Sequence, residues 1–418
     1  MQFPVNSPLR KWSLLGVAAV LALAYIAAAA REPVATFFAN RIELTSLQRA
    51  ARIDPTSADY FYRLGRYFLL VAQDPATAVK PFREAVFLNP HAARYWFDLA
   101  NTYQVLGDRD SQTDALEHAI ETDPKTPDVA WEAANLFLVR GENDHALREF
   151  RVVMESGSYQ ADAAMQLCWR IQPDVDALLR DVVPNQAGAY VSFISALMAK
   201  QQTAETEKVW PALIATHETF DRGFFFEYIK YLIAKKDIDQ AQLVWRQGAL
   251  VFGLQPYVPS TSNLMVNPDF SFDVLNGGFD WQYHKINAIT LALDSSEYHA
   301  GPRSLSITFH GPGVDDAGIY EAIVVKPGTK YNFTGFYKTA ELEGAGGPHF
   351  TIQDVYGENI LYESDELKDS SFWKSIDGDF TTGPDTKLIL FHLRRLPAGN
   401  AIRGKLWIDD FRLVQKQE

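Results

Sequence analysis

The chain has 418 residues, of which 47% are hydrophobic and 13% aromatic, so it can bury the cores of two or three domains. Its 52 acidic residues outnumber its 39 basic ones, and the formal charge of −13 at pH 7 argues against nucleic acid as the main partner. The single cysteine, Cys168, excludes an intramolecular disulfide, and its apolar helical surroundings predict a buried thiol.

The N-terminus contains an uncharged segment from Trp12 to Ala30. A helix of this length, at about 1.5 Å per residue, just spans the hydrocarbon core of a membrane. Arg10 and Lys11 precede it, so we expect 1–11 to be a cytoplasmic tail, 12–30 a transmembrane helix in the bacterial inner membrane, and the rest periplasmic. The small residues that end the segment also resemble a signal-peptidase site, which leaves open a secreted periplasmic protein.

A repeated order of large and small residues follows, in three successive units. The units are Phe61, Leu64, Gly65, Phe68, Ala78, Phe82, Ala85 and Pro90; then Trp96, Leu99, Ala100, Tyr103, Leu116, Ala119 and Pro124; then Ala130, Ala133, Ala134, Phe137, Ala146, Phe150 and Val153. The first unit has one extra residue in its turn, and the other two share a register of ~34 residues. This pattern resembles the tetratricopeptide-repeat family, whose two-helix units stack into a solenoid.

The resemblance extends beyond these units in both directions and covers 58–253. Upstream, Leu47, Ala50 and Pro55 keep the spacing of a second helix alone, so we expect 31–156 to hold a half-repeat and three repeats. Downstream the register weakens, and we interpret 157–254 as degenerate helical repeats, with two helix pairs within 187–253.

The composition changes near residue 255, where helical periodicity gives way to short alternating runs divided by Gly, Pro and Asn. We expect a linker at 255–262 and an all-β domain at 263–418. The strands expected there are 289–293, 304–309, 318–325, 330–338, 349–354, 373–380, 387–393 and 405–414. Strands of this number and length suit a two-sheet sandwich or jelly roll.

Four motifs in this domain resemble bacterial carbohydrate-binding modules of the family 4/9 type, which are galactose-binding-like jelly rolls. They are Asn267–Phe270 with Gly278 and Trp281, His299–Leu305, Val325–Phe333, and Trp407–Leu413. The expected architecture is therefore multidomain: an N-terminal transmembrane helix, an all-α tetratricopeptide-repeat solenoid and an all-β jelly-roll sandwich.

The resemblance implies a site for structural calcium, which needs several oxygen ligands near the first and last strands. Asp409 and Asp410 are present, but Ser271 stands where the family pattern usually has Glu. The sequence leaves structural calcium in the jelly roll open, beside simple capping roles for these acids, and indicates no other cofactor.

Sugar binding by such a sandwich needs flat aromatic faces together with a few amides or acids. The available aromatic candidates are Trp281, Tyr283, Tyr320, Tyr356 and Trp373. In a sandwich these rings can equally be core residues, Trp281 and Trp373 above all.

In the repeats, the resemblance places six side chains on the concave groove: Tyr62, Arg66, Phe97, Asn101, Trp131 and Asn135. Asn101 and Asn135 lie one repeat apart, and an amide can both donate to and accept from an extended peptide backbone. The sequence therefore predicts a peptide groove, with a merely solvated face as the alternative.

No catalytic motif accompanies these modules. The sequence has no Gly-rich phosphate loop, His-Glu-x-x-His helix or Gly-x-Ser-x-Gly turn. Asp409 and Asp410 are adjacent on an expected strand, so their side chains point to opposite faces and are poorly placed as an acid and base pair.

These observations predict a binding protein, not an enzyme. We expect a periplasmic scaffold whose repeats hold a protein or peptide and whose jelly roll holds a glycan or a second protein, in polysaccharide assembly or export. The alternative is a targeting or docking subunit of a carbohydrate-active enzyme.

Overall fold

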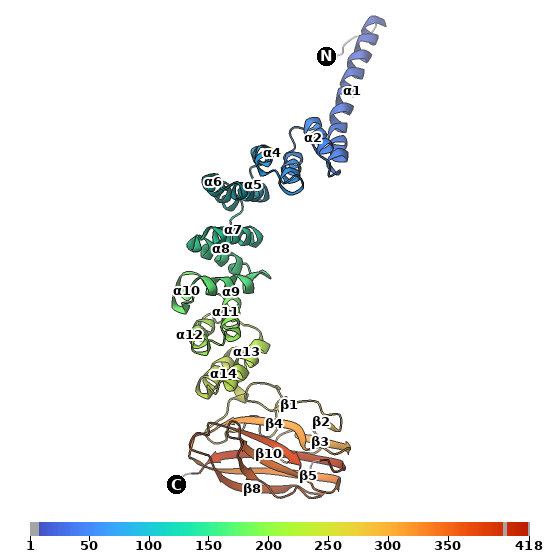
Figure 1. Cartoon of the computed structure of the whole chain (residues 1–418). Helices are drawn as coiled ribbons and strands as arrows, with labels where there is room; N and C mark the ends of the chain where they lie inside the picture. Colours follow the sequence, from blue (N-terminus) through green and yellow to red (C-terminus); the bar gives the residue numbers. More distant parts are fainter. Residues whose placement is uncertain (1–7, 396–398, 417–418) are drawn as a thin grey trace, which may run out of the picture. The chain divides into compact units, whose positions relative to one another are not determined.

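The computed structural model describes residues 8–395 and 399–416, so most of the expected cytoplasmic tail lies outside the described residues. It confirms the predicted fold class: an apolar N-terminal helix, an all-α region, and two antiparallel sheets that form a sandwich (Figure 1). The chain divides into two compact units, Met1–Pro184 and Asn185–Glu418, which are described separately below.

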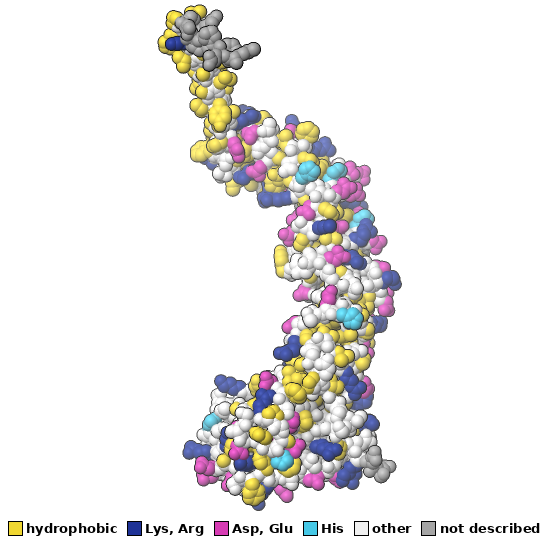
Figure 2. Space-filling view, turned by 180° about the vertical axis from the view of Figure 1, so that it is seen from behind, with side chains coloured by type: hydrophobic (Ala, Val, Ile, Leu, Met, Phe, Trp, Pro, Cys, Tyr) yellow, Lys and Arg dark blue, Asp and Glu magenta, His cyan; other side chains and the backbone are white. Residues whose placement is uncertain are grey.

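The first unit begins with helix α1 (Pro8–Ala39), which runs without interruption through the uncharged segment. In the described part of the chain it is the one helix long and apolar enough to cross a membrane. Figure 2 shows hydrophobic side chains along its visible face, and they have no protein to pack against. The helix does not end where the uncharged segment ends, but continues for nine more residues.

The end of α1 packs against the helix that follows it, α2 (Leu44–Ile53). Ala35 and Ala39 form a small core with Ala50, Ala51 and Tyr60. Small residues let the two helix backbones approach closely, so the last turns of α1 act as the partner helix that the predicted half-repeat lacked. The apolar helix and the first helix of the repeats are thus one continuous element.

Further helices of the first unit form packed pairs. They are α3 (Ala58–Arg66), the π-helical turn η1 (Tyr67–Val71), α4 (Pro75–Leu88), α5 (Ala93–Leu106), α6 (Arg109–Thr122), α7 (Pro127–Arg140), α8 (Asn143–Glu155), α9 (Ala161–Ile171) and α10 (Val175–Asp181). Gly65 shows why small residues recur, because a Cβ there would lie only 2.7 Å from Cδ1 of Phe82. Cys168 is buried in α9, and burial raises the pKa of its thiol to about 12.

The second unit contains two more helix pairs and the sandwich. Its helices are α11 (Ala187–Ala199), α12 (Thr203–Ala215), α13 (Arg222–Ala234), α14 (Ile238–Phe252) and the short 3-10 helix η2 (Gln255–Tyr257). Its strands are β1 (Gln282–Tyr283), β2 (Ile289–Asp294), β3 (Ser304–Gly311), β4 (Asp316–Val324), β5 (Lys330–Gly344), β6 (Pro348–Asp354), β7 (Ile360–Glu363), β8 (Lys374–Thr381), β9 (Leu388–Arg395) and β10 (Ile402–Gln415).

The strands form two five-stranded antiparallel sheets, in the orders β1-β4-β9-β6-β7 and β2-β3-β10-β5-β8. Alternate residues of each strand point between the sheets, where aromatic rings fill the core. Phe333, Phe350, Phe391 and Phe411 contact one another with ring centroids 5.1 to 6.1 Å apart.

Helices α13 and α14 pack directly on the sandwich. Trp245 of α14 donates a hydrogen bond from Nε1 to the carbonyl oxygen of Tyr257, at 3.0 Å. Tyr257 is itself buried and donates from its hydroxyl to the carbonyl oxygen of Asp273, at 2.7 Å. The segment 255–262, expected as a linker, therefore holds packed and hydrogen-bonded side chains that join the last helices to the first loop of the sandwich.

Candidate functional site

A cleft of about 360 Å³ lies between helix α13 and the outer face of sheet β1-β4-β9-β6-β7. The sheet side follows from strand alternation: Ile319 and Ile323 of β4 point into the core, so Tyr320 and Ala322 point outward. Its lining comprises Gln282, Tyr320, Ala322, Val355, Leu388 and Leu390 from the sandwich strands and loops, Asn276, Gly277 and Gly278 from the loop before β1, and Phe226, Glu227, Lys230 and Ile233 from α13.

Helix α13 has one buried face and a second face that borders the cleft, and helical spacing divides its residues between them. Asp221 caps its N-terminus by accepting a hydrogen bond from the backbone N–H of Phe224, at 2.8 Å. One face of the helix, which includes Phe225 and Leu232, is buried. Phe226, Glu227, Lys230 and Ile233 follow helical spacing on another face, the one that borders the cleft.

Two contacts hold α13 over the sheet. The ring of Phe226 lies on the loop before β1, where a Cβ on Gly277 would be 2.4 Å from it. Tyr356, in the loop between β6 and β7, donates from its hydroxyl to the carbonyl oxygen of Ile233, at 2.5 Å. The ammonium group of Lys236 also lies 5.1 Å from the centre of the Tyr356 ring. The cleft is therefore a fixed part of the second unit.

The cleft combines an apolar floor with several polar groups. Tyr320 donates from its hydroxyl to Oε1 of Gln282 at 3.2 Å, and Nε2 of Gln282 donates to the carbonyl oxygen of Gly278 at 3.0 Å. Within the described part of the chain, neither Glu227 nor Lys230 makes an ion pair, and both are exposed. A phenol, an amide, a carboxylate and an ammonium group thus border one small volume, as recognition of a hydroxyl-rich ligand requires.

Two buried polar atoms without protein partners lie beside the cleft. His392 on β9 is the cross-strand neighbour of both Tyr320 and Thr351, so all three share the outer face. His392 is 7% exposed and its Nδ1 lies 3.0 Å from Oδ2 of Asp316, whereas Nε2 has no hydrogen-bond partner among residues 8–395 and 399–416. Thr351 is 1% exposed, and its Oγ1 likewise has none there. Leaving such an atom unpaired costs about 1 to 3 kcal/mol.

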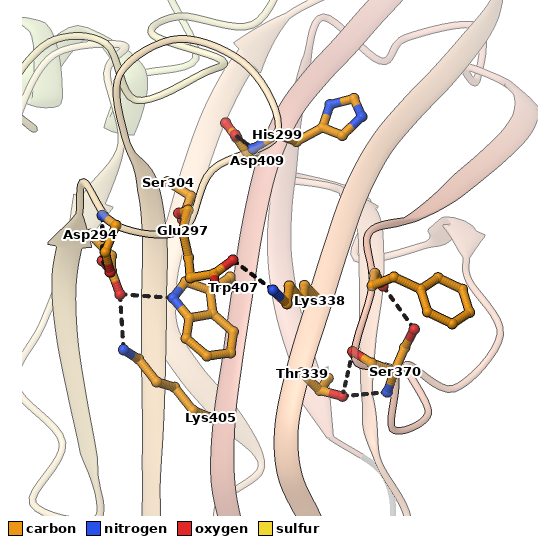
Figure 3. Close-up of polar contacts among 12 residues, drawn as sticks. Asp294, Glu297, His299, Ser304, Lys338, Thr339, Ser370, Lys405, Trp407 and Asp409 are labelled. Atoms are coloured by element: carbon orange, nitrogen blue, oxygen red, sulfur yellow. Dashed lines mark hydrogen bonds and ion pairs between the residues drawn. The ribbon is translucent and has the colours of Figure 1, made fainter.

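The outer face of the other sheet differs, because its polar groups satisfy one another (Figure 3). Asp294 accepts hydrogen bonds from Nε1 of Trp407 and Nζ of Lys405, both at 2.9 Å. Lys338 donates to Glu297 at 2.6 Å. The ammonium group of Lys405 also lies 4.5 Å from the centre of the Trp407 ring. A ligand on this face would have to displace existing ion pairs and expose the ring.

Five aromatic residues were candidates for glycan binding, and the structure distributes them widely. Tyr320 lines the cleft and Tyr356 holds α13 over it. Tyr283 is exposed on β1, but it pairs with the core-facing Ile319 and so lies on the opposite face of the strand from Gln282. Trp281 is buried in the sandwich core. Trp373 lies on the side of the other sheet, where its ring contacts that of His299 at 5.8 Å. Of the five candidates, Tyr320 is therefore the one among the described lining residues of the cleft, and Trp281 is left out of the proposed site.

Several cleft residues were not predicted from the sequence. Phe226, Glu227 and Lys230 belong to a helix that is separated from the strands by many residues, so no local pattern connects them with the cleft. The available signal for His392 was strand alternation around Leu388–Leu393, which puts a histidine on the outward face. Only strand register shows that Thr351 lies opposite it.

The carboxylate expected to bind calcium, that of Asp409, is already engaged in hydrogen bonds. Both carboxylate oxygens of Asp409 already accept backbone N–H groups, at 2.7 Å from His299, 2.9 Å from Ala300 and 2.8 Å from Asp410. Burial raises the pKa of Asp409 to about 6. No group of three or more His, Cys, Asp or Glu side chains in the described part of the chain is arranged around a metal position.

The neighbouring carbonyl oxygens accept hydrogen bonds from the guanidinium group of Arg303. Arg303 donates to the carbonyl oxygens of Phe270 and Ser271, both at 3.0 Å, and to Oδ1 of Asp273, at 2.7 Å. A calcium ion would need oxygen ligands that Arg303 already engages. The residues present therefore do not fit structural calcium.

The candidate groove residues of the repeats fall into two groups. Tyr62 and Phe97 are buried; the Tyr62 hydroxyl donates to Oδ2 of Asp98 at 2.7 Å and accepts from Nε of Arg94 at 2.6 Å. Buried side chains support the groove rather than contact a ligand.

The remaining groove candidates keep accessible surface. Arg66 lies 3.8 Å from Asp98 and is partly exposed. Asn101 and Trp131 are half-buried, and so is Asn135, whose amide donates to the carbonyl oxygen of Trp131 at 2.7 Å. Asn135 thus uses one N–H of its amide within its own helix, while the amide oxygen and the second N–H remain for a ligand.

Comparison with known proteins gives limited similarity. No protein-family model and no curated protein sequence matches this chain. Among solved structures, the CBM22-1 xylan-binding domain from Paenibacillus barcinonensis Xyn10C is 14% identical, with a TM-score of 0.27 over 36% of this chain and 92% of that one. A CBM4 structure is 16% identical, with a TM-score of 0.28 over 36% of this chain and 99% of its own. PilW, a type IV pilus biogenesis factor, is 15% identical, with a TM-score of 0.26 over 48% of this chain and 96% of its own. Scores this low assign none of these proteins' functions to this chain.

Proposed function

We propose that this protein is a non-catalytic, membrane-anchored binding protein whose C-terminal unit holds a glycan in the α13 cleft and whose repeats hold a protein partner. The cleft carries the proposal, because it joins a tyrosine and apolar side chains to Glu227 and Lys230, which are exposed and make no ion pair among the described residues. Sugar rings need both, since their C–H faces pack on apolar surface while their hydroxyls exchange hydrogen bonds.

The polar row across the sheet suits hydroxyl groups in particular. Gln282, Tyr320, His392 and Thr351 follow one another across β1, β4, β9 and β6. A sugar hydroxyl donates one hydrogen bond and accepts others, so it can pair with an imidazole nitrogen and a threonine hydroxyl at the same time.

The lining of the cleft favours binding over hydrolysis. Glycosidases require two carboxyl groups on either side of the scissile bond. Of the described lining residues, Glu227 is the one that carries a carboxylate. Glu321 lies on the same strand as Tyr320, but it is buried and its carboxyl accepts the backbone N–H of Val266, at 2.6 Å. Burial raises the pKa of Glu321 well above its usual value, which suits a neutral core residue.

The anchor is proposed to be retained in the mature protein. Helix α1 continues through Ala28–Ala30 without a break, and Arg31 donates from Nε to the carbonyl oxygen of Ile53, at 2.7 Å. Thr36 is also within hydrogen-bond distance of the Tyr60 hydroxyl, at 2.9 Å. Residues on the C-terminal side of the uncharged segment are thus part of the repeat core. The protein would face the periplasm from a single-pass inner-membrane helix, with a tail that holds Arg10 and Lys11 inside.

The setting we propose is polysaccharide assembly or export, in which a protein held by the repeats is brought to a glycan held by the sandwich. The accessible groove residues Arg66, Asn101, Trp131 and Asn135 support protein binding. Tyr283, an exposed aromatic residue at the edge of the sandwich, favours a second candidate, a targeting subunit for a carbohydrate-active enzyme. Cleavage of the bound glycan by the copurified partner would distinguish the second from the first.

A glycan array probed with the detergent-solubilised full chain tests the central claim. We expect selective binding that Tyr320→Ala and Gln282→Ala reduce by roughly tenfold or more. Tyr298→Ala is the matched control, because this exposed tyrosine does not line the cleft. No selective binding, or equal losses in all three variants, would overturn the assignment of the cleft.

A further inference from the structure

A second pocket, of about 440 Å³, lies in the first unit, where the anchor helix meets the first repeat. Its lining comprises Ala39 at the end of α1, Ile42, Leu47 of α2, Asp59, Tyr62, Arg63 and Arg66 of α3, Tyr67, Leu70 and Val71 of the π-helical turn, and Arg94 of α5. In the described part of the chain, the first repeat is the one that has the anchor helix beside it.

The π-helical turn is the physical consequence of the extra residue in the first repeat. The backbone N–H of Ala72 bonds to the carbonyl oxygen of Tyr67 at 3.0 Å, five residues back instead of four. The corresponding helices α5 and α7 end at Gly107 and Gly141, in left-handed conformation. Such bulges concentrate at functional sites, and this one supplies Tyr67, Leu70 and Val71 to the pocket wall.

Among the described residues, Arg94 is the arginine of the pocket that makes no direct ion pair, although the charge of Asp98 acts on it through space. Arg63 pairs with Asp59 at 2.6 Å, and Arg66 lies 3.8 Å from Asp98. Arg94 has no ion pair in the described part of the chain, and its Nε donates to the Tyr62 hydroxyl at 2.6 Å. Burial and the nearby Asp98 raise the pKa of Tyr62 to about 12, so this tyrosine stays neutral. The remaining donors of Arg94 suit a carboxylate.

The rim of the pocket is apolar and accessible. Ile42 is 79% exposed, Leu70 58% and Val71 56%. Large aliphatic side chains gathered at one exposed place favour an occupant that has apolar surface as well as charge. The pocket is lined by three arginines and one aspartate, so its charge is opposite in sign to the net charge of −13 on the whole chain and suits an acidic occupant.

The position along α1 argues against a lipid headgroup. Ala39 lies nine residues beyond Ala30, the end of the uncharged segment, on the same continuous helix. At ~1.5 Å per residue this is about 13 Å, whereas the headgroup layer on one side of a bilayer is roughly 5 to 8 Å thick. The pocket therefore opens above the headgroups, where the extramembrane segment of another membrane protein would pass.

We propose that this pocket binds an acidic peptide segment, an Asp or Glu flanked by aliphatic residues, from a membrane-bound partner. This rests on the proposed function of the repeats as a protein-binding scaffold and names the chemistry of the partner. The carboxylate bonds to Arg94, with Arg66 beside it, and the aliphatic neighbours pack on Leu70, Val71 and Ile42. The end of α1 supplies Ala39 to the pocket wall, so recognition and anchoring would use the same helix.

The test measures fluorescence anisotropy of labelled short peptides with the full chain in detergent micelles. The probes are peptides with one Asp flanked by Leu and the matched peptides with Asn. We expect binding only of the Asp peptides, with roughly tenfold weaker binding to Arg94→Gln and to Leu70→Ser. Arg180→Gln is the matched control, because Arg180 is exposed, pairs with Asp181 and lies outside the pocket.

Equal binding of Asp and Asn peptides, or full binding by Arg94→Gln, would overturn the proposal. Loss of peptide binding in Asn135→Ala but not in Arg94→Gln would move the partner to the groove and leave the scaffold role intact. Competition by anionic vesicles, or by an acidic oligosaccharide, would name a lipid or a glycan as the occupant and overturn the peptide. Glycan binding by Tyr320→Ala tests the cleft of the second unit and not this pocket, which lies in the first unit. Failure of one proposal can therefore be distinguished from failure of the other.

Discussion

The indole ring of Trp245 in α14 lies directly on the backbone of Gly278 in the first loop of the sandwich. A Cβ on Gly278 would be 2.0 Å from Cζ3 of Trp245, and Gly278 has a φ of +64°. Glycine is thus required twice, by the ring that covers it and by its left-handed backbone. Through this contact the last helices and the sandwich become one unit.

Gly278→Ala should destabilise the protein by about 2 to 4 kcal/mol, because it adds a clash with Trp245 to the cost of a positive φ. Gly328→Ala is the matched control: its φ is +60°, but nothing lies within 4 Å of the added Cβ, so we expect about 1 kcal/mol. Chemical denaturation of both variants measures the difference. Equal losses would show that the ring does not constrain Gly278.

The boundary at which the chain is cut should decide how stable the sandwich is. A fragment of residues 185–418 keeps the contacts of Phe226 and Trp245 with the loop before β1, whereas residues 255–418 lose them. We expect the shorter fragment to be less stable by roughly 2 to 4 kcal/mol. Thermal unfolding of the two fragments compares them. A shorter fragment as stable as the longer would mean that α13 and α14 merely rest on the sandwich.

Asp280 makes stability depend on pH. Burial raises its pKa to about 7, above the value of roughly 3.9 in an unfolded chain. A raised pKa stabilises the fold at low pH, and this contribution is lost as pH rises from about 4 to 7, with a slope of at most ~1.4 kcal/mol per pH unit. Asp280→Asn should flatten the pH dependence of the free energy of unfolding, and Asp385→Asn, an exposed control, should not. A slope unchanged in Asp280→Asn would contradict this.

The substitution Thr351→Val tests whether the Thr351 hydroxyl serves ligand binding or the stability of the fold. Valine keeps the shape of threonine and removes an Oγ1 that has no partner within the described residues. We expect the free energy of unfolding to stay equal or rise by up to about 1 kcal/mol, while glycan affinity falls. Thr308→Val, on the other sheet, is a control for affinity. Destabilisation of Thr351→Val would show that the hydroxyl is already satisfied in the free protein.

Removal of calcium should leave the protein unchanged. Because Asp409 is satisfied by backbone N–H groups and Arg303 holds the nearby carbonyl oxygens, we expect the same melting temperature in excess chelator and in millimolar calcium. Arg303→Ala should lower it in both conditions, since it leaves the carbonyl oxygens of Phe270 and Ser271 without this donor. A melting temperature that rises with calcium would restore the metal site.

Strand prediction succeeded for the longer strands and failed for the two shortest, β1 and β7. The alternation of β5 or β10 extends over many residues and is visible in the sequence. β1 has two residues and β7 has four, too few for a period of two to stand out. Both lie at the edges of the sheet that carries the cleft, so the missed strands include the one that supplies Gln282.

The order of small and large residues within each repeat determined the helix pairs, because close packing of two helices demands small side chains at fixed spacing. The uncharged N-terminal segment likewise determined a membrane-length helix. Tertiary structure alone decided that this helix continues into the repeat core, and that α13 covers one face of the sandwich. The physical reason is that local periodicity specifies which face of an element is apolar, whereas the identity of the face that covers it depends on contacts between residues far apart in the chain.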